Sequence, residues 1–238
     1  AAAEAAVDAF VTRDNMVIGV GSGSTIVPAV ARLEEVVRAE RHGVRRVVCV
    51  PTSHQARQLV LAAAARAPRA DAIVLSDLEQ HATLDVAIDG ADEAALPSLA
   101  LIKGGGACLT QEKVVASAAR HFVVVADESK RSARLGTRWR KGVPIEVVPM
   151  AHAVVARRLR ELPPPFAATD VVVRTGSGKA GPVVTDNGGF VLDAHFAADA
   201  LAAPAQLDAH VRALAGVVET GLFVGMATCA FFGAPDGT

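Results

Sequence analysis

In the first half of the chain, short apolar runs alternate with segments whose apolar residues recur every three or four positions. The short runs predict buried strands, because they are bounded by glycine, proline and polar turn residues. These strands are expected at 16–20, 44–50, 71–75, 84–88 and 122–126. The segments with helical spacing are expected at 4–12, 27–37, from Ser53 onward and at 112–120. Strands that alternate with helices predict an α/β fold with a doubly wound, mostly parallel sheet.

The pattern changes after Leu135. In order, it predicts a strand at 144–149, a helix at 152–162, strands at 170–174 and 183–192, a helix at 206–214 and a strand at 216–223. The turn between the two middle strands is expected at 176–182. Strand, helix, two strands, helix and strand is the ferredoxin-like order. We therefore expect a Rossmann-like catalytic domain at 1–135 and 222–238, and a smaller ferredoxin-like α+β domain at 136–221.

Composition narrows the classes of protein. Hydrophobic residues make up 51% of the chain, but alanine supplies much of this and no apolar run is long enough to predict a membrane span. The first ten residues lack the basic leader of a secretory signal. A net charge of −1 gives no electrostatic reason to expect binding to nucleic acid or a membrane surface. The three cysteines, at 49, 108 and 229, lack both disulfide and zinc spacing, so we expect a reducing, cytoplasmic location.

Candidate chemistry is concentrated after the strand at 84–88. The charged and glycine positions there, in chain order, are Asp89, Asp92, Lys103, Gly104, Gly105, Gly106 and Glu112. Parallel sheets bind ligands outside the carboxyl ends of their strands, and glycines let backbone N–H groups approach an anion. Carboxylates, a lysine and backbone donors at one strand end predict proton transfer on a small polar substrate. The alternative is a capped loop with solvated surface acids.

A second candidate site follows the strand at 16–20. Gly21-Ser22-Gly23-Ser24-Thr25 leads into a helix, and this arrangement favours a phosphate, because N–H groups and the helix dipole face the anion. The dinucleotide pattern G-x-G-x-x-G fails at its last glycine, and no acidic residue stands at the end of the following strand to bind the ribose. Both departures argue against a nicotinamide-dependent enzyme. A helix that is merely capped by Ser24 or Thr25 is the simpler alternative.

Two further motifs carry little weight. His54 stands at a predicted helix start, where a lone histidine is more often a surface or hydrogen-bonded residue than a catalytic base. The segment 176–179, Gly-Ser-Gly-Lys, imitates part of a nucleotide-binding loop but lacks its glycine spacing and the Ser or Thr that binds magnesium. We interpret this segment as the tip of a hairpin.

Several motifs together resemble one enzyme family. Asp-Gly-Ala-Asp-Glu at 89–93, Lys-Gly-Gly-Gly-Ala at 103–107 with Glu-Lys at 112–113, Thr-Asp-Asn-Gly at 185–188, and the segment 216–223 are similar to ribose-5-phosphate isomerase of the A type. The resemblance covers nearly the whole chain. Ser22 stands where threonine is more usual, Gly189 stands where asparagine is more usual, and the loop from 93 to 103 is slightly long.

The resemblance implies an aldose-ketose isomerase that interconverts ribose 5-phosphate and ribulose 5-phosphate through an enediolate, in the non-oxidative pentose phosphate pathway. It implies that Glu112 moves the proton, while Lys103 and the amides of Gly104–Gly106 stabilise the enediolate. Asp89 is expected to assist ring opening. Asp92 is expected to hold substrate hydroxyls and balance the charge of Lys103.

The resemblance also implies that the protein binds the phosphate group of the substrate. The residues concerned are Ser22, Gly23, Ser24, Thr25 and Lys130. A solvated surface lysine is the alternative for Lys130, and whether a phosphate-binding lysine precedes Ala1 stays open. No motif predicts a metal or nucleotide site, and a lysine with backbone amides can supply the electrophilic chemistry, so we expect no metal and no cofactor. The resemblance implies a sugar phosphate as the partner molecule, and a homodimer or homotetramer.

Two other classes of protein stay open beside the isomerase. One is a sugar-phosphate sensor or deaminase-like relative with the same type of sheet. A sensor would not need Glu112 and usually carries a DNA-reading segment, which is missing from this sequence. The other is a nicotinamide-dependent enzyme, which the incomplete G-x-G-x-x-G pattern disfavours.

Overall fold

The computed structural model describes residues 1–234, which form two compact units. The first unit contains Ala1–Gly90, Gln111–Glu128 and the chain from Met226 on. The second contains Ala91–Thr110 and Ser129–Gly225. The chain therefore passes between the units four times, and each unit is described by itself.

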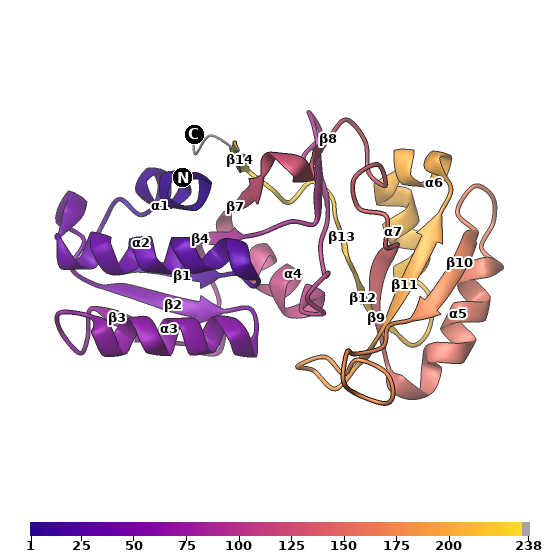
Figure 1. Ribbon diagram of the computed structural model, residues 1–238, viewed down its shortest axis with the longest axis horizontal. Helices are drawn as coiled ribbons and strands as arrows, with labels where there is room; N and C mark the ends of the chain where they lie inside the picture. The colour runs from indigo at the N-terminus through magenta and orange to yellow at the C-terminus, as the bar shows by residue number, and fades with distance from the viewer. Residues whose placement is uncertain (235–238) are drawn as a thin grey trace. The chain divides into compact units, whose positions relative to one another are not determined.

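The first unit is built on a six-stranded parallel sheet. Its strands, in spatial order, are β14 (Cys229–Gly233), β7 (Ala119–Asp127), β4 (Leu84–Asp89), β1 (Met16–Val20), β2 (Val47–Pro51) and β3 (Ile73–Leu75). Strand β1 lies between β2 and β4 (Figure 1). Its residue Ile18 pairs with Cys49 on one side and with Val86 on the other. The chain proceeds outward from β1 in one direction through β2 and β3, and in the other through β4, β7 and β14. The strand order reverses between β1 and β4, and such a switch point is where doubly wound sheets bind ligands.

Helices α1 (Ala2–Phe10), α2 (Val27–Arg38), α3 (His54–Arg66) and most of α4 (Leu109–Ala118) belong to this unit. Of the four residues expected to face inward, helix α2 buries Val30, Leu33 and Val37, because apolar residues at this spacing share one side of a helix. The fourth, Val27 in the first turn, is exposed. Ser53 caps α3 as expected, since its hydroxyl accepts a hydrogen bond from the amide of Ala56 at 3.0 Å. Within the described chain, no helix combines the length and the apolar character that crossing a membrane requires.

The second unit contains the predicted ferredoxin-like element order. It consists of β9 (Val143–Val147), α5 (His152–Arg160), β10 (Ala168–Val173), β11 (Phe190–Phe196), α7 (Pro204–Arg212) and β12 (Val217–Thr220), with the short α6 (Ala198–Ala202) inserted before α7. The sheet order is β10-β11-β9-β12, and every pair is antiparallel. Helices α5 and α7 pack against this sheet (Figure 1). A mostly parallel sheet and a separate antiparallel α+β sheet confirm the predicted fold class.

A second small sheet in this unit was not predicted. Strands β13 (Leu222–Phe223), β6 (Ala100–Ile102), β5 (Glu93–Ala95) and β8 (Arg131–Ser132) form it in that spatial order. The single strand predicted at 216–223 is wrong, because 217–220 pairs with β9 whereas 222–223 pairs with β6. The other three strands have only two or three residues each, which is too little periodicity to be recognised, and pairing between distant segments holds them. The predicted domain division stays a prediction, and the compact units of the structure differ from it at 91–110, 129–135 and 222–225.

The strand predicted at 183–192 is wrong in its position. The structure places β11 at Phe190–Phe196, while 183–189 forms a loop that turns at Gly188, where φ is +80°. Glu146 explains the loop, because its carboxylate accepts a hydrogen bond from the Thr185 hydroxyl at 2.7 Å. A Cβ atom at Gly189 would lie 2.6 Å from Oε1 of the same carboxylate, so a larger residue there would displace the Glu146 side chain. The hydrogen bonds to Glu146 therefore override the β-propensity of this segment.

Candidate active site

The switch point of the first unit is a close contact between the ends of β1 and β4. The amide of Gly21 donates to the carbonyl of Ile88 at 2.9 Å. A Cβ atom at Gly21 would lie 2.1 Å from Oδ1 of Asp89, so only glycine fits at this position. The glycine-rich turn and the Asp89 carboxylate are thus packed directly together.

Asp89 is held rigidly at the end of β4. Its side chain is buried, and Oδ1 accepts hydrogen bonds from the amides of Ser22 at 3.0 Å and Gly90 at 2.7 Å. Two backbone donors on the same oxygen fix the orientation of this carboxylate. The structure therefore brings the predicted Asp89 together with the predicted glycine-rich turn.

The glycine-rich turn uses several of its donors within the protein. The Ser22 hydroxyl lies 2.9 Å from the hydroxyl of Thr52 and donates to that of Ser53 at 2.7 Å, and the amide of Gly23 donates to Oε1 of Gln55 at 2.8 Å. These bonds tie the turn to the start of α3.

The donors left for an anion come from the start of the next helix. Ser24 and Thr25 begin the 3₁₀ helix η1 (Ser24–Ile26), whose first amides have no partner inside the helix. In the described part of the chain, no acceptor is recorded for these two amides. The predicted phosphate cradle thus divides into Ser22 and Gly23, which hold the turn, and Ser24 and Thr25, which offer N–H groups.

Glu112 lies in the first turn of α4, as expected, although the helix begins three residues earlier than predicted. The helix packs closely on β1, because a Cβ atom at Gly19 would lie 2.6 Å from Cγ1 of Val115. Glu112 and Val115 are three residues apart and share one face of the helix. The buried carboxylate of Glu112 is therefore held by a helix anchored on the central strand of the sheet.

In the second unit, Asp92 binds the glycine triplet. Oδ2 of Asp92 accepts a hydrogen bond from the amide of Gly105 at 2.7 Å. Burial raises the pKa of Asp92 above its ordinary value, although the Gly105 amide and the charges of Lys103 and Lys130 oppose the rise. The pKa thus reflects both the burial of Asp92 and the two predicted lysines whose charges act on it.

Lys103 follows β6 and is buried. Its amide donates to the carbonyl of Gly221 at 2.8 Å, and its ammonium nitrogen lies 5.4 Å from the ring centroid of Phe223. A Cβ atom at Gly221 would lie 2.2 Å from the carbonyl oxygen of Lys103. The segment around Gly221, for which the sequence indicated no chemical role, therefore supports the backbone of Lys103.

Arg174 and Asp193 are the residues near the glycine triplet that the sequence reasoning missed. Nη1 of Arg174 donates to the carbonyl oxygens of Gly104 at 2.8 Å and Gly105 at 3.1 Å. Its Nε and Nη2 donate to the carboxylate of Asp193 at 2.9 Å and 2.5 Å. Arg174 follows β10 and Asp193 lies within β11, and no motif distinguishes either from other charged residues of a hairpin.

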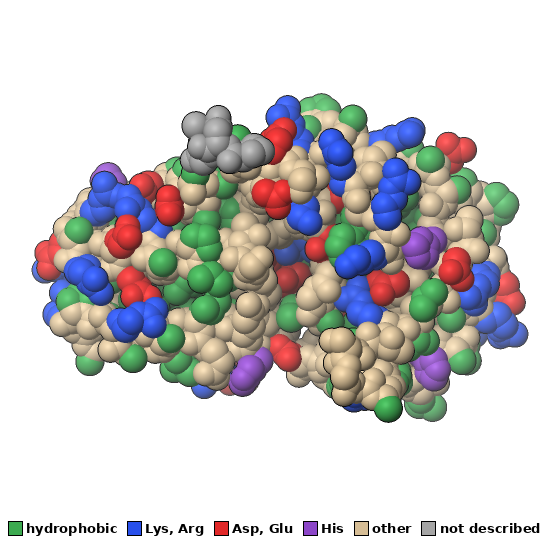
Figure 2. Space-filling view, viewed as in Figure 1, with side chains coloured by type: hydrophobic (Ala, Val, Ile, Leu, Met, Phe, Trp, Pro, Cys, Tyr) green, Lys and Arg blue, Asp and Glu red, His purple; other side chains and the backbone are tan. Residues whose placement is uncertain are grey.

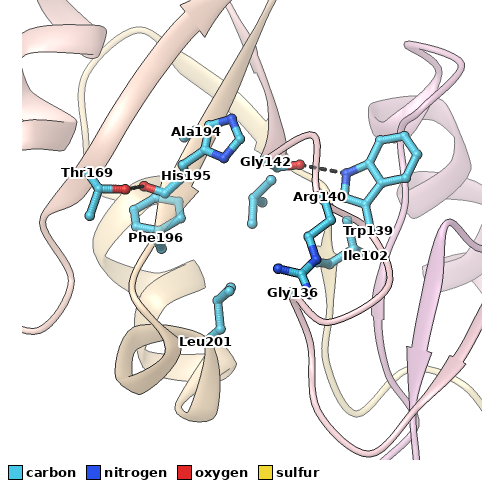
Figure 3. A pocket seen from close by; sticks show the side chains of 11 residues that line it. Ile102, Gly136, Trp139, Arg140, Gly142, Thr169, Ala194, His195, Phe196 and Leu201 are labelled. Carbon is cyan, nitrogen blue, oxygen red and sulfur yellow. Dashed lines mark hydrogen bonds between the residues drawn. The ribbon is translucent and has the colours of Figure 1, made fainter.

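A cavity of about 230 Å³ lies in the second unit (Figure 3). Its wall includes Trp139, Arg140, His195 and Phe196, and the indole N–H of Trp139 donates to the carbonyl of Gly142 at 2.7 Å. Its lining contains none of the predicted site residues.

Charge and metal-ligand geometry add little to the picture. Among the described residues, no group of three or more His, Cys, Asp or Glu side chains is arranged to hold a metal ion. On the face shown in Figure 2, acidic and basic side chains are interspersed.

Comparisons with known proteins identify the family. The model of the family described as ribose 5-phosphate isomerase A (phosphoriboisomerase A) matches residues 48–237. Human ribose-5-phosphate isomerase is 48% identical over 237 residues, which cover 100% of this chain and 70% of the relative. The enzyme of Dictyostelium discoideum is 47% identical, with 100% and 94% covered.

Solved structures agree as well. Ribose 5-phosphate isomerase A from Methanocaldococcus jannaschii superimposes with a TM-score of 0.83 at 36% identity, covering 99% of this chain and 94% of that one. A D-ribose-5-phosphate isomerase in complex with phospho-erythronic acid gives a TM-score of 0.85 at 37% identity, covering 99% and 93%. The resemblance seen in the sequence motifs is confirmed: this chain belongs to the ribose 5-phosphate isomerase A family.

Proposed function

We propose that this protein interconverts D-ribose 5-phosphate and D-ribulose 5-phosphate. The observation that carries the proposal is the 48% identity to human ribose-5-phosphate isomerase across the whole of this chain. The reaction removes a proton from C2 of the open-chain aldose, passes through an enediolate and returns a proton to C1. It requires a base, a stabiliser for the negative charge on oxygen, and a site for the phosphate.

Glu112 is the proposed base. Its carboxylate lies in the first turn of α4, where the helix dipole favours the negative charge that proton abstraction needs. A carboxylate that accepts the proton from C2 and returns it to C1 serves both directions of the reaction, because the same group is base in one half and acid in the other.

Lys103 and the amide of Gly106 are the proposed stabilisers of the enediolate. The amide of Gly105 already binds Asp92, so it is not free for the substrate. In the described chain, the amide of Gly106 has no recorded acceptor. Positive charge and fixed N–H donors directed at a developing oxyanion lower the barrier, since they need no reorganisation during the reaction.

The two aspartates have separate proposed roles. Asp89 assists opening of the sugar ring, in which the C1 hydroxyl loses a proton and the ring oxygen gains one. Asp92 holds substrate hydroxyls and balances the charge of Lys103, which acts on its pKa.

The 5-phosphate is proposed to bind the amides and hydroxyls of Ser24 and Thr25 and the ammonium group of Lys130. Anions bind helix N-termini because several N–H groups converge there with the positive end of the helix dipole. Ser22 and Gly23 contribute by holding the turn in place.

The related structure with phospho-erythronic acid supports a sugar phosphate as the substrate. This four-carbon acid carries a phosphate at one end and a carboxylate at the other. Its carboxylate has two oxygen atoms with shared negative charge, as the enediolate has at C1 and C2. The same compound should therefore inhibit this protein by occupying the phosphate site and the enediolate site together.

We propose that the protein is a homodimer or homotetramer of the cytoplasm, in the non-oxidative pentose phosphate pathway, and that it needs no metal or cofactor. The three cysteines are all free, which supports a reducing compartment. Lysine and backbone amides provide the positive charge that a metal would otherwise supply.

The direct test is turnover of ribose 5-phosphate by the purified protein, followed by the appearance of ribulose 5-phosphate and of deuterium at carbon in heavy water. We expect activity on the phosphate ester, poor activity on free ribose, and no loss after exhaustive dialysis against a chelator. Absence of turnover would refute the proposed function. Activity that is lost on dialysis and restored by zinc or magnesium would refute the metal-free chemistry alone.

A further inference from the structure

Arg174 connects the glycine triplet to a buried ion pair. Four of its five N–H donors are used, two by the Asp193 carboxylate and two by the carbonyl oxygens of Gly104 and Gly105. Both charged side chains are only 15% exposed. Arg174 therefore has little capacity left to bind a substrate, and its contacts are directed at the protein backbone.

Arginine and aspartate suit this task geometrically. The two-point contact with Asp193 fixes the plane of the guanidinium group, so that Nη1 is presented to both carbonyl oxygens. A lysine ammonium at the same position would supply the charge without the planar fork. The arrangement is therefore specific for orientation and not only for charge.

The contacts of Arg174 determine where two amides point. In a planar trans peptide, the C=O and the N–H of the same unit point in opposite directions. The carbonyls of Gly104 and Gly105 share peptide units with the amides of Gly105 and Gly106, so both amides point away from the guanidinium group. The Gly105 amide does so and meets Asp92 at 2.7 Å. The Gly106 amide is directed away from Arg174 for the same reason.

The glycine triplet needs such a restraint. Gly104 has φ of +102°, and glycine residues adopt many backbone conformations with similar energies. Rotation of the Gly105–Gly106 peptide would exchange the N–H for a carbonyl oxygen. A carbonyl facing an enediolate would repel the charge that the N–H stabilises.

We propose that Arg174, oriented by Asp193, is a positioning residue that holds the Gly106 amide toward the enediolate oxygens. This inference rests on the proposed isomerase function and deepens it. Arg174 acts on the reaction through the peptide of Gly105 and Gly106, and it makes no contact with the substrate.

The test compares Arg174→Met and Arg174→Lys with wild type in steady-state kinetics with ribose 5-phosphate. Removal of one oxyanion donor typically costs about 10²–10³-fold in turnover, so we expect kcat to fall by that order in both variants. KM should stay within about threefold, because the interaction forms only as charge develops. The inhibition constant of phospho-erythronic acid should rise by about the factor by which kcat/KM falls. Asp193→Asn should give a smaller loss than either, because it keeps one acceptor for Arg174.

Two control variants separate positioning from stability. Val211→Ala removes buried side-chain volume from α7 and should lower the melting temperature without lowering kcat. Arg160→Met removes a partly exposed arginine whose Nη2 donates to the carbonyl of Val171 on β10, and it should be kinetically silent. Val211→Ala thus controls for a loss of stability, and Arg160→Met controls for the removal of an arginine near β10.

Each contrary result has a distinct meaning. Near-normal kcat in Arg174→Met, or full rescue by Arg174→Lys, would overturn the positioning role while the isomerase function stands. A raised KM with unchanged kcat would show that Arg174 binds substrate, which also overturns the proposal. Equal loss of kcat in Val211→Ala at the same melting temperature would assign the effect to general destabilisation. Absence of turnover in wild type would overturn the proposed function itself, and the positioning role with it.

Discussion

Glu93 offers a sharp test of how the second unit is held together. Its side chain is fully buried, and its carboxylate receives five hydrogen bonds from residues 136–139. Three of the donors bind Oε1, while the amides of Gly136 and Trp139 bind Oε2 at 2.8 Å and 3.2 Å. The carboxylate of Glu93, the residue that follows Asp92, thus holds the loop that precedes β9.

Glu93→Gln is the informative substitution, because the shape is kept while one oxygen becomes an NH₂ group. At least two backbone amides then lose their acceptor and face N–H donors instead. Hydrogen bonds to a charged group contribute about 1.5–3 kcal/mol each, so the loss should amount to about 3–6 kcal/mol. For a chain of this size, each kcal/mol lost from the free energy of unfolding lowers the melting temperature by about 2–4 °C. The melting temperature should therefore fall by roughly 6–24 °C.

The same reasoning predicts a dependence on pH. Burial by itself raises the pKa of Glu93, but hydrogen bonds, led by that from the Arg138 amide, lower the pKa below its ordinary value. A lowered pKa contributes stability above the unfolded-state pKa of about 4.3, and this contribution is lost as pH falls toward the folded-state pKa. The difference between wild type and Glu93→Gln should therefore be full at neutral pH and shrink below about pH 4.3.

The assay is thermal unfolding followed by circular dichroism at several pH values. Glu161→Gln is the matched control, because Glu161 is 58% exposed and lies 3.8 Å from Arg157 in a surface pair. Its effect should stay below about 0.5 kcal/mol. A shift of less than about 2 °C in Glu93→Gln at pH 7 would refute the reasoning. It would mean that the five donors find other acceptors at little cost.

Three other predictions concern the proposed catalytic groups. Glu112→Gln should lower kcat by about 10²–10⁴-fold with little change in KM or melting temperature, and it should stop exchange of deuterium into the substrate; normal exchange would assign the base to another residue. Asp92→Asn should be at least as stable as wild type at pH 7, because burial raises the pKa of Asp92 and its charge opposes folding. The stability advantage of Asp92→Asn over wild type should develop as pH rises from about 3.9 to the raised folded-state pKa, and it should stay constant at higher pH. A variant that is less stable than wild type at every pH in thermal unfolding would contradict this sign. Thr25→Ala and Lys130→Ala should mainly raise KM in steady-state kinetics, because a phosphate contact is present in ground and transition states alike; a loss confined to kcat would remove these residues from the phosphate site.

Local pattern was enough to predict the layers of the fold and most candidate residues. Runs such as 84–88 and 122–126 become part of β4 and β7, because a strand buried on both faces in a parallel sheet is mostly apolar. Ser53 caps α3 and Glu112 lies in the first turn of α4 for equally local reasons, since capping and helix position depend on neighbouring residues. The family resemblance rested on motifs of the same local kind.

Only the tertiary structure decided which polar groups bind one another. The five donors that Glu93 collects come from residues 43 to 46 positions away, and Arg174 reaches Gly104 across 70 positions. The sequence motif could not show that Ser22 and Gly23 donate hydrogen bonds to residues at the start of α3. It also could not show that the Gly105 amide donates to Asp92. Hydrogen bonds need atoms within about 3 Å, whereas periodicity reports only which side of an element a residue occupies. The sequence by itself therefore determined the larger helices and most strands of the two main sheets, together with the candidate chemistry. The three-dimensional fold determined the short strands and which donors are left for a substrate.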